Sequence, residues 1–281
     1  MNENSPKKST KDNILVLVVV LVVIAGISAG ILAVVDSVTR EPRIKASLKA
    51  TVAAFKELQP DFTNEPVDEE INIGESEGKL IILPKGTDLS KYGSSVITFY
   101  PAMDKGELIS VLAKTVNNQG YGGNITILVA MRPNGALQNV VVTDNNETPG
   151  LGTAVFSRKV QKTIWGILNG EHNDSKNALP PNEFLDFFQE KEYITNDKYH
   201  SGMMKNIIPA SKWKVEKDGG DFKYITGATI TSRAITLGVE KIVSAYYSER
   251  AALLKAFKYD DVDKVDTYEP NLKLFDVNPK K

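Results

Sequence analysis

The sequence predicts an α+β protein in which an N-terminal transmembrane helix precedes one domain built from an antiparallel sheet and packed helices. Three observations lead to this fold class. An apolar run without charge extends from Ile14 to Val35. Runs rich in β-branched residues alternate with turn signals between residues 79 and 143, and a helical apolar repeat extends from Ser232 to about Phe257. The chain therefore combines a membrane anchor with a folded domain.

The apolar run at residues 14–35 has the length of a membrane span. As a helix, its 22 residues rise about 33 Å, which is enough to cross the hydrocarbon core of a bilayer. A cleaved signal peptide has a shorter apolar region, and a buried core helix rarely lacks polar residues so completely. We expect residues 1–13, with three lysines, in the cytoplasm, and the domain on the periplasmic side of the inner membrane.

Residues 36–78 are expected to form an amphipathic helix and a linker. Apolar residues recur at helical spacing between residues 43 and 58, and Pro60 marks the end of the helix. The recurring residues are Ile44, Leu48, Val52, Phe55 and Leu58. The acidic and polar sequence that follows is typical of a linker.

The folded domain is predicted to occupy residues 79–257. Its strands are expected at residues 79–83, 95–100, 107–114, 124–131 and 138–143. The turn signal Pro133-Asn134-Gly135 joins the last two strands, so we expect them to form an antiparallel pair.

A second helix and an insertion are expected after these strands. The apolar face of the helix consists of Val155, Phe156, Val160, Ile164, Trp165 and Leu168. Residues from about 169 to 210 are polar and contain proline, so we interpret them as an insertion, with a helical patch near 184–188. A further strand is predicted at residues 213–216, and the polar residues 258–281 are expected to form a solvated tail.

Composition excludes several classes of function. The 281 residues carry a formal net charge of -1 and no basic stripe, so nucleic-acid binding is not expected. The absence of cysteine excludes disulfides, cysteine zinc sites and iron–sulfur ligation by this chain. The two histidines, His172 and His200, lie in polar sequence, where we expect solvated side chains and no metal site.

The run at residues 224–233 is a candidate phosphate-binding turn. Gly227 permits an unusual backbone conformation, and the hydroxyls of Thr229, Thr231 and Ser232 lie where the free amides of a helix's first turn point outward. Taken alone, however, the run is more typical of an ordinary helix N-cap, formed by Thr231 or Ser232.

The loop at residues 144–153 is a second junction between a loop and a helix. Gly150 and Gly152 would let a ligand approach the backbone closely. On the simpler interpretation, Pro149 and Gly150 only shape a turn and Glu147 only favours the N-terminus of a helix.

Taken in order, the motifs of the chain resemble those of a known family. The membrane anchor is followed by Gly-Tyr-Gly-Gly-Asn-Ile at 120–125, Glu-Thr-Pro-Gly-Leu-Gly at 147–152 and Thr-Gly-Ala-Thr-Ile-Thr-Ser at 226–232. This series resembles the FMN-binding G subunit of the Rnf electron-transport complex over roughly residues 14–257. The same domain type occurs in the C subunit of the sodium-translocating NADH:quinone reductase, which is the closest alternative.

The resemblance implies a flavoprotein with FMN attached covalently to Thr229 through a phosphoester bond. Residues around the phosphate would be Thr226, Gly227, Ala228 and Thr231, and the lip against the flavin ring would be Glu147, Thr148, Gly150, Leu151 and Gly152. Glu147 could instead hold its loop by binding the loop's own backbone amides. In the family, a flavin transferase attaches the FMN and reads an acidic residue before the motif, for which Asp221 is the candidate.

The function implied is that of an electron-carrier subunit in a membrane complex. Such a complex couples electron transfer between ferredoxin and NAD⁺ to the translocation of Na⁺ or H⁺, and this subunit would be an incomplete enzyme without its partner subunits. A contrasting hypothesis is an anchored, non-redox binding or scaffold domain, in which the threonine turn only caps a helix.

Overall fold

The computed structural model describes residues 10–158, 181–194 and 206–259. The chain divides into two compact units, Met1–Ala50 and Thr51–Lys281. Parts of several predicted segments lie outside the described residues, namely Val160, Ile164, Trp165 and Leu168, much of the insertion, both histidines and the tail from residue 260.

The first unit consists of most of helix α1, which runs from Thr10 to Leu58. The helix is long and apolar enough to cross a membrane, and its most apolar window is not buried inside the protein. The two helices predicted at 14–35 and 43–58 are parts of this one helix, because Pro42 lies within it without ending it. A proline removes one backbone donor, and the hydrogen bonds of the turns on either side can continue the helix.

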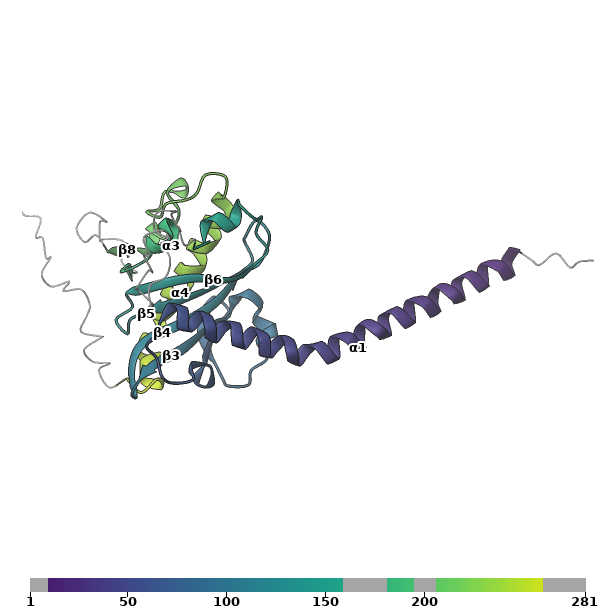
Figure 1. Cartoon of the computed structure of the whole chain (residues 1–281), viewed down its shortest axis with the longest axis horizontal. Coiled ribbons are helices and arrows are strands. Elements are labelled where there is room, and N and C mark those ends of the chain that lie inside the picture. The colour runs from purple at the N-terminus through teal and green to yellow at the C-terminus, as the bar shows by residue number, and fades with distance from the viewer. Residues whose placement is uncertain (1–9, 159–180, 195–205, 260–281) are drawn as a thin grey trace, which may run out of the picture. The chain divides into compact units, whose positions relative to one another are not determined.

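The second unit is built on a six-stranded antiparallel sheet with the order β2-β1-β3-β4-β5-β6, part of which Figure 1 shows. The strands are β1 (Ile71–Ser76), β2 (Lys79–Leu83), β3 (Ile97–Asp104), β4 (Glu107–Asn117), β5 (Ile125–Met131) and β6 (Leu137–Asn145). The antiparallel sheet and the predicted β5–β6 pair are confirmed. Strand β1 was not predicted, because Asn72, Gly74 and Glu75 weaken its β pattern.

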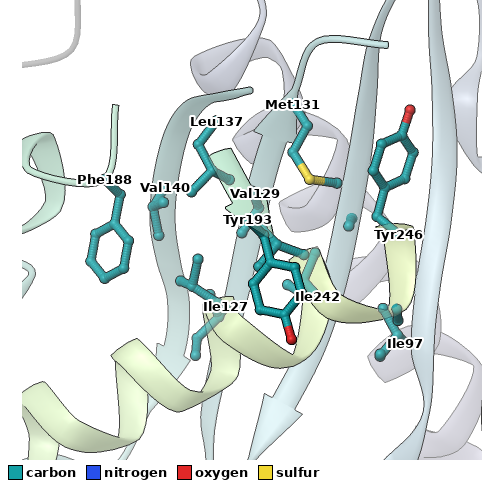
Figure 2. Close-up of a cluster of buried hydrophobic side chains, with 14 of the residues drawn as sticks. Ile97, Ile127, Val129, Met131, Leu137, Val140, Phe188, Tyr193, Ile242 and Tyr246 are labelled. Atoms are coloured by element: carbon teal, nitrogen blue, oxygen red, sulfur yellow. The ribbon is translucent and has the colours of Figure 1, made fainter. Parts of the chain in front are cut away.

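Both faces of the sheet are covered, so the inner strands are buried on both sides. Along β5, Ile127 and Val129 belong to one core, and Leu128 between them belongs to the other. This alternation follows the two-residue period of a strand. Helix α4 (Thr229–Ala256) packs on β4 and β5, and Figure 2 shows Ile242 of α4 against side chains of the sheet.

The opposite face of the sheet is covered by the last turns of α1. Ala54, Phe55 and Leu58 pack there with Phe62, and the rings of Phe55 and Tyr100 have centroids 4.8 Å apart. This smaller core lies entirely in the second unit.

Short elements complete the described part of the domain. The 3-10 helices are η1 (Pro66–Glu69), η2 (Leu89–Ser95), η3 (Gly152–Val155), η4 (Ala210–Lys212) and η5 (Glu216–Asp218). Helix α3 (Glu183–Asp186) falls at the predicted helical patch, and β7 (Glu192–Ile194) pairs in parallel with β8 (Ile207–Pro209).

The strand predicted at residues 213–216 is wrong. This segment is irregular, and only Val215 forms an isolated bridge, with Phe222. Trp213 and Val215 favour strands by residue type, but here burial decides their placement: both are buried, and the Trp213 indole N–H donates to the carbonyl of Ile208 at 2.9 Å.

Candidate functional site

Strand register brings two of the sequence motifs to one end of the sheet. Ile125 of β5 is paired with Asn117 of β4 on one side and with Asn145 of β6 on the other. The loops at 118–124 and 146–152 therefore start or end on the same line across the sheet. The side-chain amide of Asn117 donates to the carbonyl of Ala234 at 2.7 Å, which places the first turns of α4 at this end as well.

A cavity of about 480 Å³ lies where these loops meet the beginning of α4. Its lining residues are Tyr121, Glu147, Thr148, Leu151, Gly152, Gly227, Ala228, Thr229, Ile230 and Thr231. The structure thus brings together eight of the ten residues predicted for the site. Thr226 and Gly150, the other two, are exposed and lie outside this lining set.

The turn before α4 leaves the end of the helix without a side-chain cap. Helix α4 begins at Thr229, three residues before the predicted start, and its N-cap residue is Ala228, which has no capping side chain. Gly227 makes the turn possible with a φ of 85°. The first-turn amides of a helix carry partial positive charge, so this end of α4 is suited to an anion.

The hydroxyls near this turn have different surroundings. Ser232 donates to the carbonyl of Ala228 at 3.1 Å and accepts from the amide of Ile225 at 3.2 Å, so it braces the turn and does not cap the helix. Thr229 is half-buried at the cavity, and within the described part of the chain its hydroxyl has no hydrogen-bond partner. Its oxygen is therefore the one best placed for chemistry at the helix end.

Glu147 connects the three parts of the site. Its side chain is 5% exposed, and its two oxygens accept hydrogen bonds from the amide of Gly122 at 3.1 Å and the hydroxyl of Thr231 at 2.7 Å. Its own amide donates to the side chain of Asn145 at 3.1 Å. The described contacts of the carboxylate are therefore with a neighbouring loop and the helix, and not with its own loop's amides, which was the alternative that the sequence left open.

The remainder of the 147–152 motif forms a tight turn. The amides of Leu151 and Thr153 both donate to the carbonyl of Thr148, at 3.2 and 3.3 Å, and the amide of Gly150 donates to the Thr153 hydroxyl at 2.9 Å. Gly150 has a φ of 79°, which explains the glycine. Because the turn satisfies its own backbone, it holds the Leu151 side chain outward at the cavity.

Exposed apolar side chains gather at the cavity. In the described part of the second unit, the exposed large apolar residues are Ile81, Ile82, Tyr121, Leu151 and Ile230. Tyr121, Leu151 and Ile230, which are 70%, 57% and 44% exposed, all line the cavity, and we call them the apolar rim. Solvent exposure of such groups indicates a surface that contacts a ligand or partner.

Two members of the rim were not predicted. Tyr121 lies inside the glycine-rich run at 120–125. An aromatic residue within a loop motif is the feature of the sequence that could have identified it as a site residue. Ile230 lies on the exposed side of the first turn of α4, and its role becomes visible only once the start of the helix is known.

Asp221 lies in the loop that leads to the turn. Its amide donates to the carbonyl of Lys212 at 3.0 Å, and the nearby Lys223 forms an ion pair of 3.0 Å with Glu183. Among the described residues, no group of three or more acidic or histidine side chains has an arrangement that could hold a metal ion.

The fold and the cavity define a small α+β domain that presents an open helix end and an apolar rim to a ligand. Residues 120–244 match the family model described as the FMN-binding domain, and this stretch contains all three motifs of the cavity. The chain therefore carries an FMN-binding domain.

Among curated proteins, the chain is similar to several that are named as the G subunit of an ion-translocating oxidoreductase complex, which confirms the resemblance drawn from the motifs. The relative from Pseudoalteromonas atlantica is 28% identical over 56% of this chain and 57% of its own length. The relative from Vibrio cholerae is 31% identical over 51% of this chain and 53% of its own length. For the relative from Stutzerimonas stutzeri the identity is 26%, over 73% of this chain and 68% of its own length. The chain thus spans a little over half the length of the first two relatives.

Proposed function

We propose that the protein is a membrane-anchored electron carrier with FMN attached through a phosphoester bond to Thr229. It would serve as one component of an Rnf-type complex that couples electron transfer between ferredoxin and NAD⁺ to the translocation of Na⁺ or H⁺. One observation carries the proposal: the hydroxyl of Thr229, which has no hydrogen-bond partner among the described residues, lies at the cavity on an uncapped helix end, within the stretch that matches the FMN-binding domain.

The residues present fit the chemical parts of FMN. The first-turn amides of α4 suit the phosphate, which remains negatively charged in a phosphoester. The apolar rim suits the flat ring system, since ligand sites combine apolar walls with a few polar anchors. When bound, FMN would supply the electron-accepting and electron-donating chemistry, and the chain would hold and tune it.

In the attachment reaction, the oxygen of Thr229 forms a bond to the flavin phosphorus and loses its proton. The donor would be a flavin dinucleotide, whose P–O–P bond breaks so that a nucleoside monophosphate leaves and takes up the proton. The chain gains the mass of FMN less one water. A flavin transferase would perform the reaction, and Asp221, in the loop before the turn, is the residue we propose that it reads.

The geometry favours this assignment over the scaffold hypothesis. A scaffold with a capping turn needs a side chain that accepts from the first-turn amides, but the N-cap residue of α4 is an alanine. The hydroxyl of Thr231 donates to Glu147, so we assign Thr231 a role through Glu147 and leave the phosphate to the backbone amides and Thr226.

The setting of the protein is proposed from its first helix and its relatives. The apolar part of α1 is long enough to span a membrane once, and the relatives are named as subunits of an ion-translocating complex. We propose a single-pass inner-membrane protein whose FMN-binding domain faces the periplasm and exchanges electrons with other subunits. The alternative is the C subunit of the sodium-translocating quinone reductase. Identification of the subunits that co-purify with the chain would distinguish the two complexes.

The test is to co-express the full chain with a flavin transferase and examine it by denaturing electrophoresis under ultraviolet light and by intact mass. We expect a fluorescent band and a mass increase of one FMN less one water, both lost completely in Thr229→Ala. Ser248→Ala is the matched control and should retain the band, because it removes an exposed hydroxyl of α4 that lies outside the cavity lining.

The stability of Thr229→Ala distinguishes the proposed attachment site from a helix cap. If Thr229 were a typical cap, Thr229→Ala would cost about 1 kcal/mol of stability. Because its hydroxyl has no partner among the described residues, we expect a smaller loss in the apoprotein. A wild-type chain without fluorescence, or a Thr229→Ala chain that still fluoresces, would refute covalent attachment at this residue.

A further inference from the structure

We propose that Glu147 is a positioning residue that aligns the helix end carrying Thr229 with the two loops carrying the apolar rim, and that its charge lowers the reduction potential of the bound flavin. The proposal rests on the proposed function, because it concerns the same cavity. It goes further by assigning one buried side chain to the assembly and tuning of the site.

The first support is that Glu147 bridges segments that are far apart in the sequence. One oxygen accepts from the amide of Gly122, which is 25 residues away, and the other accepts from the hydroxyl of Thr231, which is 84 residues away. Thr231 is 1% exposed, so the bond to the helix is shielded from water. A shielded hydrogen bond to a charged group is among the stronger ones in proteins.

The second support is that glycines surround the Glu147 side chain. A Cβ at Gly120 would lie 2.6 Å from a carboxylate oxygen of Glu147, and a Cβ at Gly152 would overlap with the other oxygen. At Gly122 a Cβ would overlap with the carbonyl of Asn146. Two backbone segments, at Gly120 and Gly152, thus approach the carboxylate as closely as glycine allows, which leaves it little freedom to turn elsewhere.

These contacts determine the relative position of the groups offered to the flavin. Gly122 follows Tyr121 directly, and Thr231 is two residues after Thr229 in the first turn of α4. Because Glu147 holds both Gly122 and Thr231, the distance between the apolar rim and the Thr229 oxygen is fixed. A displacement of about 1 Å at such a site is enough to impair its chemistry.

The charge of Glu147 has a second effect. A carboxylate beside the first turn of α4 is favourably placed relative to the helix dipole. Glu147 would place a fixed negative charge beside a bound flavin, and this charge would oppose the gain of negative charge that reduction brings. Removing the charge while keeping the shape should shift the midpoint potential in the positive direction.

The experiment uses the full chain in detergent, with and without a flavin transferase, and compares Glu147→Ala, Glu147→Gln and Thr231→Val. Hydrogen exchange of the apoprotein reports the alignment of residues 120–123 and 229–233. In-gel fluorescence reports flavin loading, and a redox titration of the loaded protein reports the potential. Glu107→Gln removes an exposed carboxylate, and Thr236→Val removes a buried hydroxyl that donates to the carbonyl of Ser232, so these are the matched controls.

We expect Glu147→Ala to accelerate exchange at both segments and to reduce flavin loading. Glu147→Gln should restore slow exchange and loading, because the amide has the same shape and can bond to both partners, but its potential should be more positive than that of the wild type. Thr231→Val should accelerate exchange at 229–233 alone, and adding it to Glu147→Ala should cause no further change there, since the bond is already lost. Both controls should behave as the wild type.

Unchanged exchange in Glu147→Ala, or additive effects of Glu147→Ala and Thr231→Val, would overturn the positioning role. An unchanged potential in Glu147→Gln would overturn the effect of charge. If Glu147→Ala does not fold, Thr231→Val tests the bridge alone, and unchanged exchange in it would count against the proposal. A wild-type chain that takes up no flavin would refute the proposed function, while exchange in the apoprotein would still test the alignment.

Discussion

The two faces of the sheet are covered in different ways, and only one of them contributes to the cavity. The face packed by α4 carries the larger core, which includes Ala228 at the start of the helix. The face packed by the last turns of α1 carries a smaller core without any cavity-lining residue. One face therefore holds the start of α4 at the cavity, while the other holds the end of α1 to the domain.

We expect the largest effect from a substitution in the smaller core, which should lower the stability of the domain without changing the cavity. Phe55 is fully buried against Tyr100, so Phe55→Ala should destabilise the domain by about 3–5 kcal/mol, through lost burial and the cavity left behind. Protein that remains folded should still attach flavin. Thermal unfolding in detergent measures the first effect and in-gel fluorescence the second.

Ile82→Ala is the control for this prediction, because Ile82 is partly exposed on β2 and should change stability little. Folded Phe55→Ala protein that fails to take flavin would show that the smaller core does contribute to the site, and the distinction between the faces would be lost.

A smaller effect is expected on the α4 face, at Gly238. A Cβ there would overlap with the Cδ1 atom of Ile127 and would lie 3.6 Å from the Cβ of Asn117. Overpacking of this kind costs about 1–3 kcal/mol, and the higher helix propensity of alanine offsets about 1 kcal/mol. Gly238→Ala should therefore be destabilising by about 1 kcal/mol, and because the Ile127 side chain or α4 must give way, flavin loading should fall to the extent that α4 moves.

Ser248→Ala, at an exposed position on the same helix, is the matched control and should leave loading unchanged. Normal loading in Gly238→Ala, together with the expected loss of stability, would indicate that the site tolerates movement of α4. That result would weaken the link between this face and the cavity.

The smallest effect is expected where the first turns of α4 meet solvent. Arg233 forms two hydrogen bonds with the carboxylate of Asp218, at 2.5 and 2.7 Å, and they hold the pKa of Asp218 below its usual range. Because the folded pKa lies below the unfolded one, the ion pair stabilises the fold above the unfolded pKa, and the contribution is lost as the pH falls through the folded pKa. Both side chains are substantially exposed, so the contribution is small.

Thermal midpoints of the wild type and Asp218→Asn, measured from neutral pH down to about pH 3, test this point. The variant should be slightly less stable at neutral pH, and the two proteins should converge in acid. Parallel curves over the whole range would show that this ion pair does not support the start of α4.

The sheet was largely predictable because its strands follow local patterns. The runs rich in β-branched residues and the Pro-Asn-Gly turn identify β5 and β6 from neighbouring residues alone. Prediction failed where tertiary burial overrides local preference: Trp213 and Val215 are strand formers held in an irregular, buried segment. It also failed at the start of α4, where Ser232 has the residue type of a cap but braces the preceding turn.

The cavity was predictable in its parts but not in its connections. The motifs at 147–152 and 226–232 both contribute lining residues. The bridge through Glu147 joins residues 84 positions apart, and no local pattern reports which of several polar neighbours a carboxylate will contact. Tyr121 and Ile230 are apolar residues at the surface, which a pattern of buried faces does not select.

The exposure of the apolar rim has a consequence for how tightly the ring must be held. A flavin tied to Thr229 would be confined near the cavity at an effective concentration on the order of millimolar. At that concentration, an intrinsic affinity of about 4 kcal/mol keeps the cavity half occupied. Three partly exposed side chains can suffice for such weak binding, and the ring could then leave and return many times without being lost to the surrounding solution.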